Sequence, residues 1–166
     1  KYLALKKMDR NVRQGRFSVL APVTLARVAQ SLKYPSEDER TITLLPGWDL
    51  SDIARYFEQE GIASAEDVYA VLGRPAYNYK MEGSRAPSID IKAYVLDDKP
   101  SYVSFEGYLA PETYRIFNDA KVSDIAEKLI RYRDSQISEQ MRREMKLQKR
   151  TMFEVLTLAS IVEREV

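Results

Sequence analysis

Two glutamates at the end of an apolar run are the strongest candidates for chemistry in this sequence. Glu163 and Glu165 close residues 155–162, which are apolar over most of a helical circumference, as expected of a helix in a core. At about 100° per residue, Glu165 falls beside Leu158 and Ile161, and Glu163 falls beside Leu156 and Met152, so we expect both carboxylates to border apolar surface. Desolvation favours the protonated carboxyl that a general acid requires. Alternatively, one or both pair with a cation, and periodicity alone does not choose between the two glutamates.

A second candidate lies at residues 105–114, FEGYLAPETY. Gly107 and Pro111 indicate a tight, shaped loop. Its mixture of tyrosines and glutamates, including Glu106 and Tyr114, suits a wall on which sugar rings stack and carboxylates accept from hydroxyls. The same residues are also compatible with a purely structural turn.

Composition narrows the chemistry further. The 166 residues include no histidine and no cysteine, which excludes Ser-His-Asp and thiol catalysis and also His- or Cys-bound metals. Lys plus Arg number 26 against 25 Asp plus Glu, and this balance argues against a dedicated nucleic-acid binder. With 45% hydrophobic and 31% charged residues the chain is typical of a globular domain. No run approaches the ~20 apolar residues of a membrane span. Because it opens at Lys1 and a helix is still running at its end, we expect a fragment of a longer protein.

The elements that must position these residues begin with a repeated strand–helix pattern. We expect strands at 15–20 and 41–45, each followed by a turn and by a helix, the first capped by Thr24 and the second by Asp49. The two units register at an offset of 25 residues, with identities at Leu20/Leu45, Leu25/Leu50 and Ala29/Ala54. Such units bury little alone, so we expect them to pack as one α+β module. They could equally be a duplicated structural unit without a binding role.

Further elements follow along the chain. Ser64 predicts a capped helix to Leu72, and the alternation over 89–95 predicts a strand inside the irregular segment 74–104. Ser123 predicts the start of a long helix that continues or restarts through Met145. The spacing of Thr151 and Glu154 predicts a capping box for the last helix. A basic cluster precedes it, either as a solvated helix face or as a contact for an anionic polymer or lipid: Arg142, Arg143, Lys146, Lys149 and Arg150.

The order of these segments resembles the MltG (YceG-like) family of endolytic murein transglycosylases. The strand–Pro-Gly–helix unit at 41–61 resembles the family's LysM-like module. Residues 105–114 are similar to its E-G-[YF]-L-F-P-D-T-Y motif, and residues 158–165, LASIVERE, to its L-A-S-I-V-E-K-E motif. Ala110 and Glu112 depart from that pattern, and segment 74–104 is longer than in familiar members. The resemblance implies an α+β fold with a LysM-like module at 1–73, a connecting segment at 74–104, and the first part of a catalytic domain at 105–166.

The resemblance also implies a function. It makes Glu165 the catalytic acid and base that cleaves the β-1,4 bond between N-acetylmuramic acid and N-acetylglucosamine, with formation of a 1,6-anhydro sugar and with no metal or cofactor. Glu106 and Tyr114 would contact substrate, although Tyr114 could instead be a core aromatic. Glu163 would support the site.

The implied partners are peptidoglycan strands and peptidoglycan synthases, and the implied location is extracytoplasmic, behind an N-terminal membrane anchor outside this chain. The alternative is a non-catalytic wall-binding or scaffold domain, which a Glu165 that points freely into solvent would favour. The label aminodeoxychorismate lyase, given to similar sequences, would require a pyridoxal-phosphate site, and the sequence shows no convincing phosphate loop for one.

Overall fold

The computed structural model describes residues 22–32 and 39–165, and its contacts divide the chain into two compact units. Unit 1 is Lys1–Arg40 and contains helix α2, Leu25–Ser31. The Thr24 hydroxyl accepts a hydrogen bond from the Arg27 N–H at 3.3 Å, so the predicted N-cap is confirmed. The strand expected at 15–20 lies outside the described residues, so the repeat stays a prediction.

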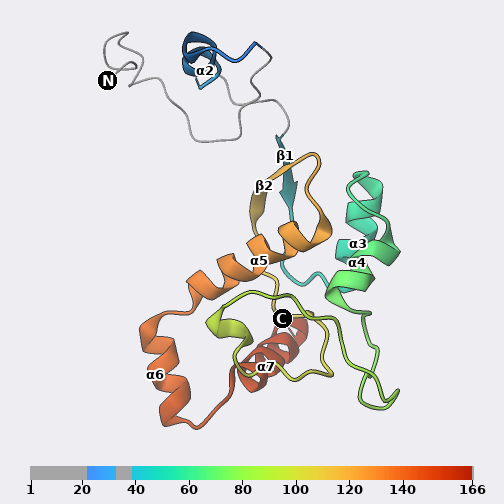
Figure 1. Ribbon diagram of the computed structural model, residues 1–166. Coiled ribbons are helices and arrows are strands. Elements are labelled where there is room, and N and C mark those ends of the chain that lie inside the picture. Colours follow the sequence, from blue (N-terminus) through green and yellow to red (C-terminus); the bar gives the residue numbers. More distant parts are fainter. Residues whose placement is uncertain (1–21, 33–38, 166) are drawn as a thin grey trace. The chain divides into compact units, whose positions relative to one another are not determined.

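Unit 2, Thr41–Val166, holds the candidate residues in a mixed α+β fold, as predicted (Figure 1). Strands β1 (Glu39–Thr43) and β2 (Thr113–Phe117) pair in a two-stranded sheet. Helices α3 (Leu50–Gln59) and α4 (Ala65–Leu72) lie against each other (Figure 1). They are followed by the short 3-10 helix η2 (Tyr94–Leu96) and then by α5 (Val122–Gln136), α6 (Glu139–Leu147) and α7 (Met152–Glu165).

Local signals in the sequence place most helix starts correctly. The Asp49 carboxylate accepts from the Ser51 and Asp52 N–H groups at 2.8 and 3.0 Å, which confirms the cap of α3. The Ser64 hydroxyl likewise caps α4. The expected cap at Ser123 is wrong: Ser123 lies inside α5, and the Asp124 carboxylate accepts from the Lys121 N–H instead.

One hydrophobic core runs through unit 2. It joins residues from β1, α3, α4, η2, the 105–109 segment, α5 and the start of α7, and its most completely buried side chains include Ile42, Phe57, Leu72, Val95, Phe105, Tyr108, Ile125, Leu129 and Met152. Residues from all three expected segments, 1–73, 74–104 and 105–166, share this core. The division into modules at 73 and 104 stays a prediction.

The strand expected at 89–95 is wrong. Residues 89–93 form no regular element, and residues 94–96 form η2. The backbone hydrogen bonds explain the difference, because they go to local or side-chain acceptors. Ile91 N–H donates to the Ile89 carbonyl, and Val95 N–H donates to Oδ1 of Asp134 on α5 at 2.8 Å. Strand β2 was not predicted, and its first two residues, Thr113 and Tyr114, lie in the segment that was expected to be a loop.

Gly73, at the end of α4, sets the approach of the 104–106 segment. It has φ of +92°, and a Cβ placed on it would lie 2.7 Å from Cβ of Ser104. The adjacent Leu72 carbonyl accepts from the Phe105 N–H at 2.8 Å. A side chain at residue 73 would therefore both strain the backbone and displace the segment that leads to Glu106.

We predict that Gly73→Ala lowers the free energy of unfolding by about 2–4 kcal/mol, because backbone strain and steric overlap add. Gly83→Ala is the matched control. Gly83 also has a positive φ, +63°, but a Cβ there would meet nothing within 4 Å, so only the backbone cost of about 1 kcal/mol remains. Chemical denaturation of both variants measures the difference, and equal losses would contradict the proposed close approach.

Candidate functional site

The Glu106 motif forms a tight turn at the edge of the core. The Tyr108 N–H donates to the Phe105 carbonyl at 3.1 Å, and Gly107 has φ of +82°, as in a type II turn. Phe105 and Tyr108 are buried on either side, whereas Glu106 and Gly107 are exposed at the corner. The burial of two aromatic rings therefore fixes the position from which Glu106 projects.

Lys99 packs against the two aromatic rings of this turn. Its Nζ lies 4.5 Å from the centroid of the Phe105 ring and 5.8 Å from that of Tyr108, and it donates to the Val103 carbonyl. Burial lowers the pKa of Lys99 to about 8. Burial also raises the pKa of the Tyr108 hydroxyl well above its usual range, and the charge of Asp98 adds to that shift.

Helix α7, which carries Glu163 and Glu165, is held at its start by two sets of interactions. The predicted capping box is confirmed: Thr151 N–H donates to Oε2 of Glu154 at 2.9 Å, and Glu154 N–H donates to Oγ1 of Thr151 at 3.1 Å. In addition, the Asp98 carboxylate accepts from the Met152 and Phe153 N–H groups at 2.6 and 3.2 Å. A negative charge at this end also complements the helix dipole.

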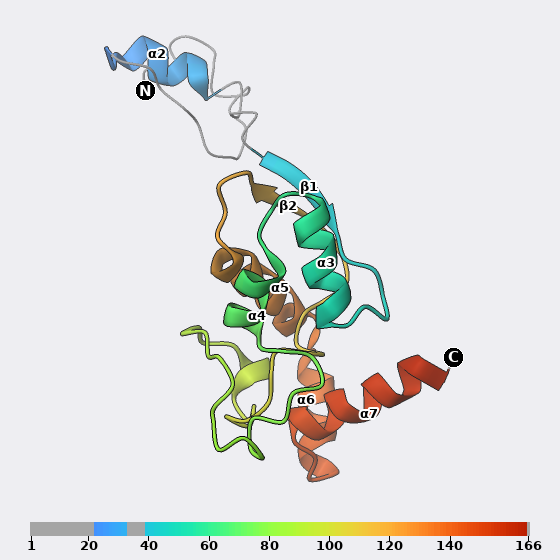
Figure 2. The same ribbon diagram turned by 90° about the vertical axis from the view of Figure 1, so that its right-hand side faces the viewer.

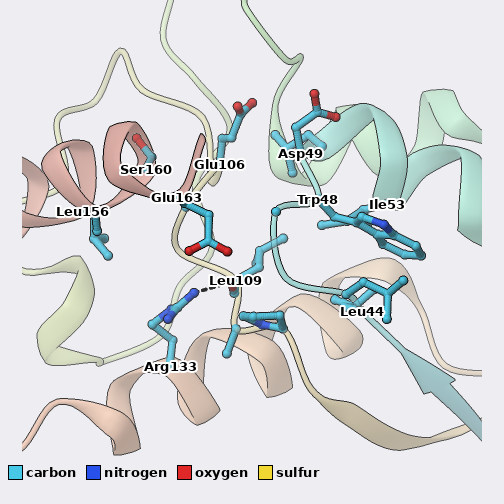
Figure 3. Close-up of a pocket in the computed structure, with 17 residues that line it drawn as sticks. Leu44, Trp48, Asp49, Ile53, Glu106, Leu109, Arg133, Leu156, Ser160 and Glu163 are labelled. Carbon is cyan, nitrogen blue, oxygen red and sulfur yellow. Dashed lines mark hydrogen bonds between the residues drawn. The ribbon is translucent and has the colours of Figure 1, made fainter. Parts of the chain in front are cut away.

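A pocket with a volume of about 250 Å³ lies between α7, the Glu106 turn and the β1–α3 connection. Trp48 and Ile53 line it from the β1–α3 side, Glu106 lines it from the turn, and Ser160 and Glu163 line it from α7 (Figure 3). The structure thus brings Glu106 and Glu163 to one pocket. Figure 3 shows their carboxylates directed away from each other, with Glu163 toward Arg133 and Leu109.

Arg133 gives this pocket its cation. Its guanidinium donates to the Leu109 carbonyl at 2.9 Å (Figure 3), and its Nε is buried without an acceptor among the residues described. Burial lowers the pKa of Arg133, while Tyr114 and the charge of Glu163 act in the opposite direction. A buried donor without a partner costs about 1–3 kcal/mol, and the charge of Glu163 on the wall of the same pocket partly offsets the burial of this cation.

Glu165 lies on the other side of α7. Two residues along a helix turn by about 200°, so Glu165 cannot share the pocket face formed by Leu156, Ser160 and Glu163. Both Glu163 and Glu165 are exposed, and the burial expected for them is not found.

The apolar neighbours of Glu165 are exposed too: Leu158 is 49%, Ile161 56% and Val162 62% accessible. Helix α7 is therefore buried only at its start, contrary to the expectation of a core helix, and Figure 2 shows it extending outward toward its C-terminal end.

Tyr114 is a core residue. Only 4% of it is accessible, its hydroxyl donates to the Ala110 carbonyl at 2.7 Å, and its ring meets Tyr132 edge to face. Burial is the main cause that raises the pKa of its hydroxyl above the usual range. Because a buried ring offers no face to a sugar, this environment fits the core-aromatic interpretation of Tyr114 and gives no support to a role in sugar binding.

Arg133 and Trp48 were not among the residues predicted for a site. Nothing in the local sequence distinguishes Arg133 from the other charged residues of α5. Only the tertiary fold brings its guanidinium to the Leu109 carbonyl. Within the described residues no cluster of three or more acidic side chains could hold a metal ion. No helix in the described ranges is long and apolar enough to cross a membrane.

We predict that Asp98→Ala lowers the free energy of unfolding by about 1 kcal/mol, the usual cost of losing a helix cap, and speeds hydrogen exchange of the first amides of α7. Asp97→Ala is the control, because Asp97 is an exposed neighbour and α7 is capped by Asp98 instead. Denaturation and amide exchange measure both variants. Equal effects of the two substitutions would show that the carboxylate does not hold the helix.

We also predict a pH dependence from Lys99. The folded state releases this proton near pH 8 and the unfolded state near 10.5, so between these values the unfolded state binds more protons and stability rises with pH. The free energy of unfolding of the unaltered chain should therefore increase relative to Lys99→Met as the pH passes from about 8 toward about 10. Denaturation curves at several pH values measure the difference, and a constant gap would contradict the burial of the amine.

Comparisons with known proteins agree with this architecture. The chain resembles the crystal structure of a protein described as yceG-like from Listeria monocytogenes, with a TM-score of 0.56 and 21% identity. The alignment covers 99% of this chain and 54% of that one, so this chain spans about half the length of the related structure. No curated protein matches significantly. The model of the YceG-like family matches residues 1–166, and the chain therefore belongs to the YceG-like family.

Proposed function

We propose that the protein containing this chain is an endolytic lytic transglycosylase that cleaves peptidoglycan strands. Membership of the YceG-like family supports the proposal. The structural observation that carries it is the arrangement of the two carboxylates of α7. Glu163 faces a cation, Arg133, across a pocket that also contains Glu106, whereas Glu165 stands on an exposed apolar face of the same helix. Two carboxylates in such different surroundings suit two different roles.

The apolar face around Glu165 provides the environment that a general acid needs once it is covered by substrate or by further protein. Leu158 and Ile161 are its neighbours on the helix. Covering these side chains would remove water from the carboxyl, and desolvation favours the protonated form. Glu163, which shares the first pocket with the Arg133 cation, would instead hold substrate hydroxyls or orient the pocket.

The reaction needs a single acid and base. Glu165 would donate its proton to the glycosidic oxygen as the bond from C1 of N-acetylmuramic acid to that oxygen breaks. The C6 hydroxyl of the same sugar would form the new bond to C1 and give its proton to the Glu165 carboxylate. No water is consumed, and the product ends in a 1,6-anhydro sugar. Because the nucleophile belongs to the substrate, proximity replaces the second carboxylate of an ordinary glycosidase.

This activity would place the protein at the extracytoplasmic side of a membrane, held by an anchor outside this chain, where peptidoglycan strands and the synthases that extend them are its partners. Neither metal nor cofactor takes part in the proposed steps.

A non-catalytic wall-binding domain is the second candidate, and the exposure of Glu165 favours it. The Glu165 side chain lies outside the pocket that holds Glu106 and Glu163. If Glu165 stays exposed to solvent in the complete protein with glycan bound, the protein would bind peptidoglycan without cleaving it.

We predict that the complete protein produces 1,6-anhydro-muramoyl ends from peptidoglycan, and that Glu165→Gln lowers the rate by roughly 10²–10⁴-fold, the usual contribution of a general acid and base. Glu163→Gln is the matched control on the same helix and should cause a smaller loss. Mass spectrometry of the products measures both, with circular dichroism as the check on folding.

The same assay separates the alternatives. Unchanged product formation in Glu165→Gln would overturn the assignment of the catalytic residue. A larger loss in Glu163→Gln than in Glu165→Gln would move the acid to the pocket face. Peptidoglycan binding without any anhydro product in the unaltered protein would favour the wall-binding domain.

A further inference from the structure

A second hollow lies on the far side of the Glu106 turn. Its volume is about 420 Å³, and it is formed mainly by residues of segment 74–104 and by the first turns of α7. It shares four lining residues with the pocket described above: Glu106, Gly107, Leu156 and Ser160. The two hollows are therefore adjacent, one on each side of the Glu106 turn. We call the pocket described above the first arm and this hollow the second arm. A ligand that extends from one arm to the other must pass Glu106.

The second arm is lined by partly exposed aromatic side chains. Tyr77 is 41% and Tyr102 39% exposed, and Phe153 of α7 is half-buried beside them. Exposed tyrosines are suited to carbohydrate, because the ring packs against the C–H face of a sugar while the hydroxyl remains available to hydrogen bond.

These rings are held in place before any ligand binds. Tyr77 packs edge to face on Tyr79 with ring centroids 4.6 Å apart. Tyr79 is itself buried, and its hydroxyl accepts from the Arg74 N–H at 2.8 Å. The Lys80 ammonium lies 5.4 Å from the Tyr102 ring centroid. A ring already held by neighbours loses little conformational freedom on binding, which favours affinity.

The backbone around Tyr77 is also unusual. Ala76, which lines the same arm, has φ of +52°, a conformation that costs a residue with a side chain about 1–2 kcal/mol. Strain of this kind persists where the surrounding structure fixes it, and it is often found at ligand sites.

Polar groups in the second arm match sugar hydroxyls and amides. The hydroxyls of Thr157 and Ser160 donate to the carbonyls of Phe153 and Thr157, at 2.7 and 2.8 Å, so their remaining lone pairs can accept. Oδ1 of Asn78 accepts from the Met81 N–H at 3.1 Å, which leaves its NH₂ group to donate. The arm thus offers both donors and acceptors between aromatic faces.

We propose that this second arm is a glycan subsite, in which Tyr77 and Tyr102 stack on sugars of a strand that continues past Glu106 from the first pocket. The inference rests on the proposed function for the identity of the ligand as a peptidoglycan strand. It adds that residues of segment 74–104 give the site a preference for long strands over short ones.

The test measures binding as a function of strand length. Peptide-free peptidoglycan strands, separated by length, are titrated into the complete protein carrying Glu165→Gln, so that cleavage does not interfere. Tyr77→Ala and Tyr102→Ala should each weaken binding of long strands about threefold to tenfold, the loss expected for one aromatic stacking contact. Binding of a disaccharide should not change.

Two control variants accompany them. Tyr77→Phe keeps the ring and should keep most of the affinity. Met81→Ala alters a side chain that is 82% exposed in the same segment but lines neither arm, and it should have no effect. Thermal unfolding confirms that each variant is folded.

An equal loss for short and long strands, or no loss for long strands, would overturn the subsite. The proposed activity is tested separately by the anhydro products. A protein that makes no such products but loses long-strand binding in both tyrosine variants would retain the subsite and lose the enzymatic function. Anhydro products together with unchanged binding of long strands in both tyrosine variants would support the enzymatic function and overturn the subsite.

Discussion

The attachment of α7 to segment 74–104 is the constraint on which the site depends. Asp98 accepts from the first two N–H groups of α7, and Met152 anchors the helix in the core. The next residue, Lys99, lies under the Phe105 ring of the Glu106 turn. Two adjacent side chains therefore set both the helix that carries Glu163 and Glu165 and the turn that carries Glu106. They act together with the burial of Met152 in the core and with the hydrogen bond from the Phe105 N–H to the Leu72 carbonyl.

This attachment leaves α7 with two different faces. One face closes a pocket with Trp48, Glu106 and Arg133, and it presents a carboxylate to a partly buried cation. The other face keeps its apolar side chains in water together with Glu165. Under the proposed function, the acid would be assembled only when a glycan or further protein covers that face. The arrangement of the two faces also explains why the resemblance to the family motif implies a catalytic Glu165, whereas the pocket contains Glu163.

Local interactions account for what could be predicted from the sequence. The caps at Thr24, Asp49, Ser64 and Thr151 involve partners within three residues, so a short pattern identifies them. The cap that Asp98 provides for Met152 spans 54 residues, and no local pattern predicts such a partner. Alternation over 89–95 suggested a strand, but the Val95 N–H donates to Asp134 rather than to another strand. Exposure of the second half of α7 is a tertiary property that an apolar sequence cannot reveal.

The most direct test of this account is a crystal structure of the complete protein, carrying Glu165→Gln, with a peptide-free peptidoglycan strand bound. We expect sugar rings that pass over the Glu106 turn between the two arms, with the carboxamide at residue 165 close to a glycosidic oxygen. A strand bound elsewhere, with both arms empty and residue 165 in open solvent, would contradict it.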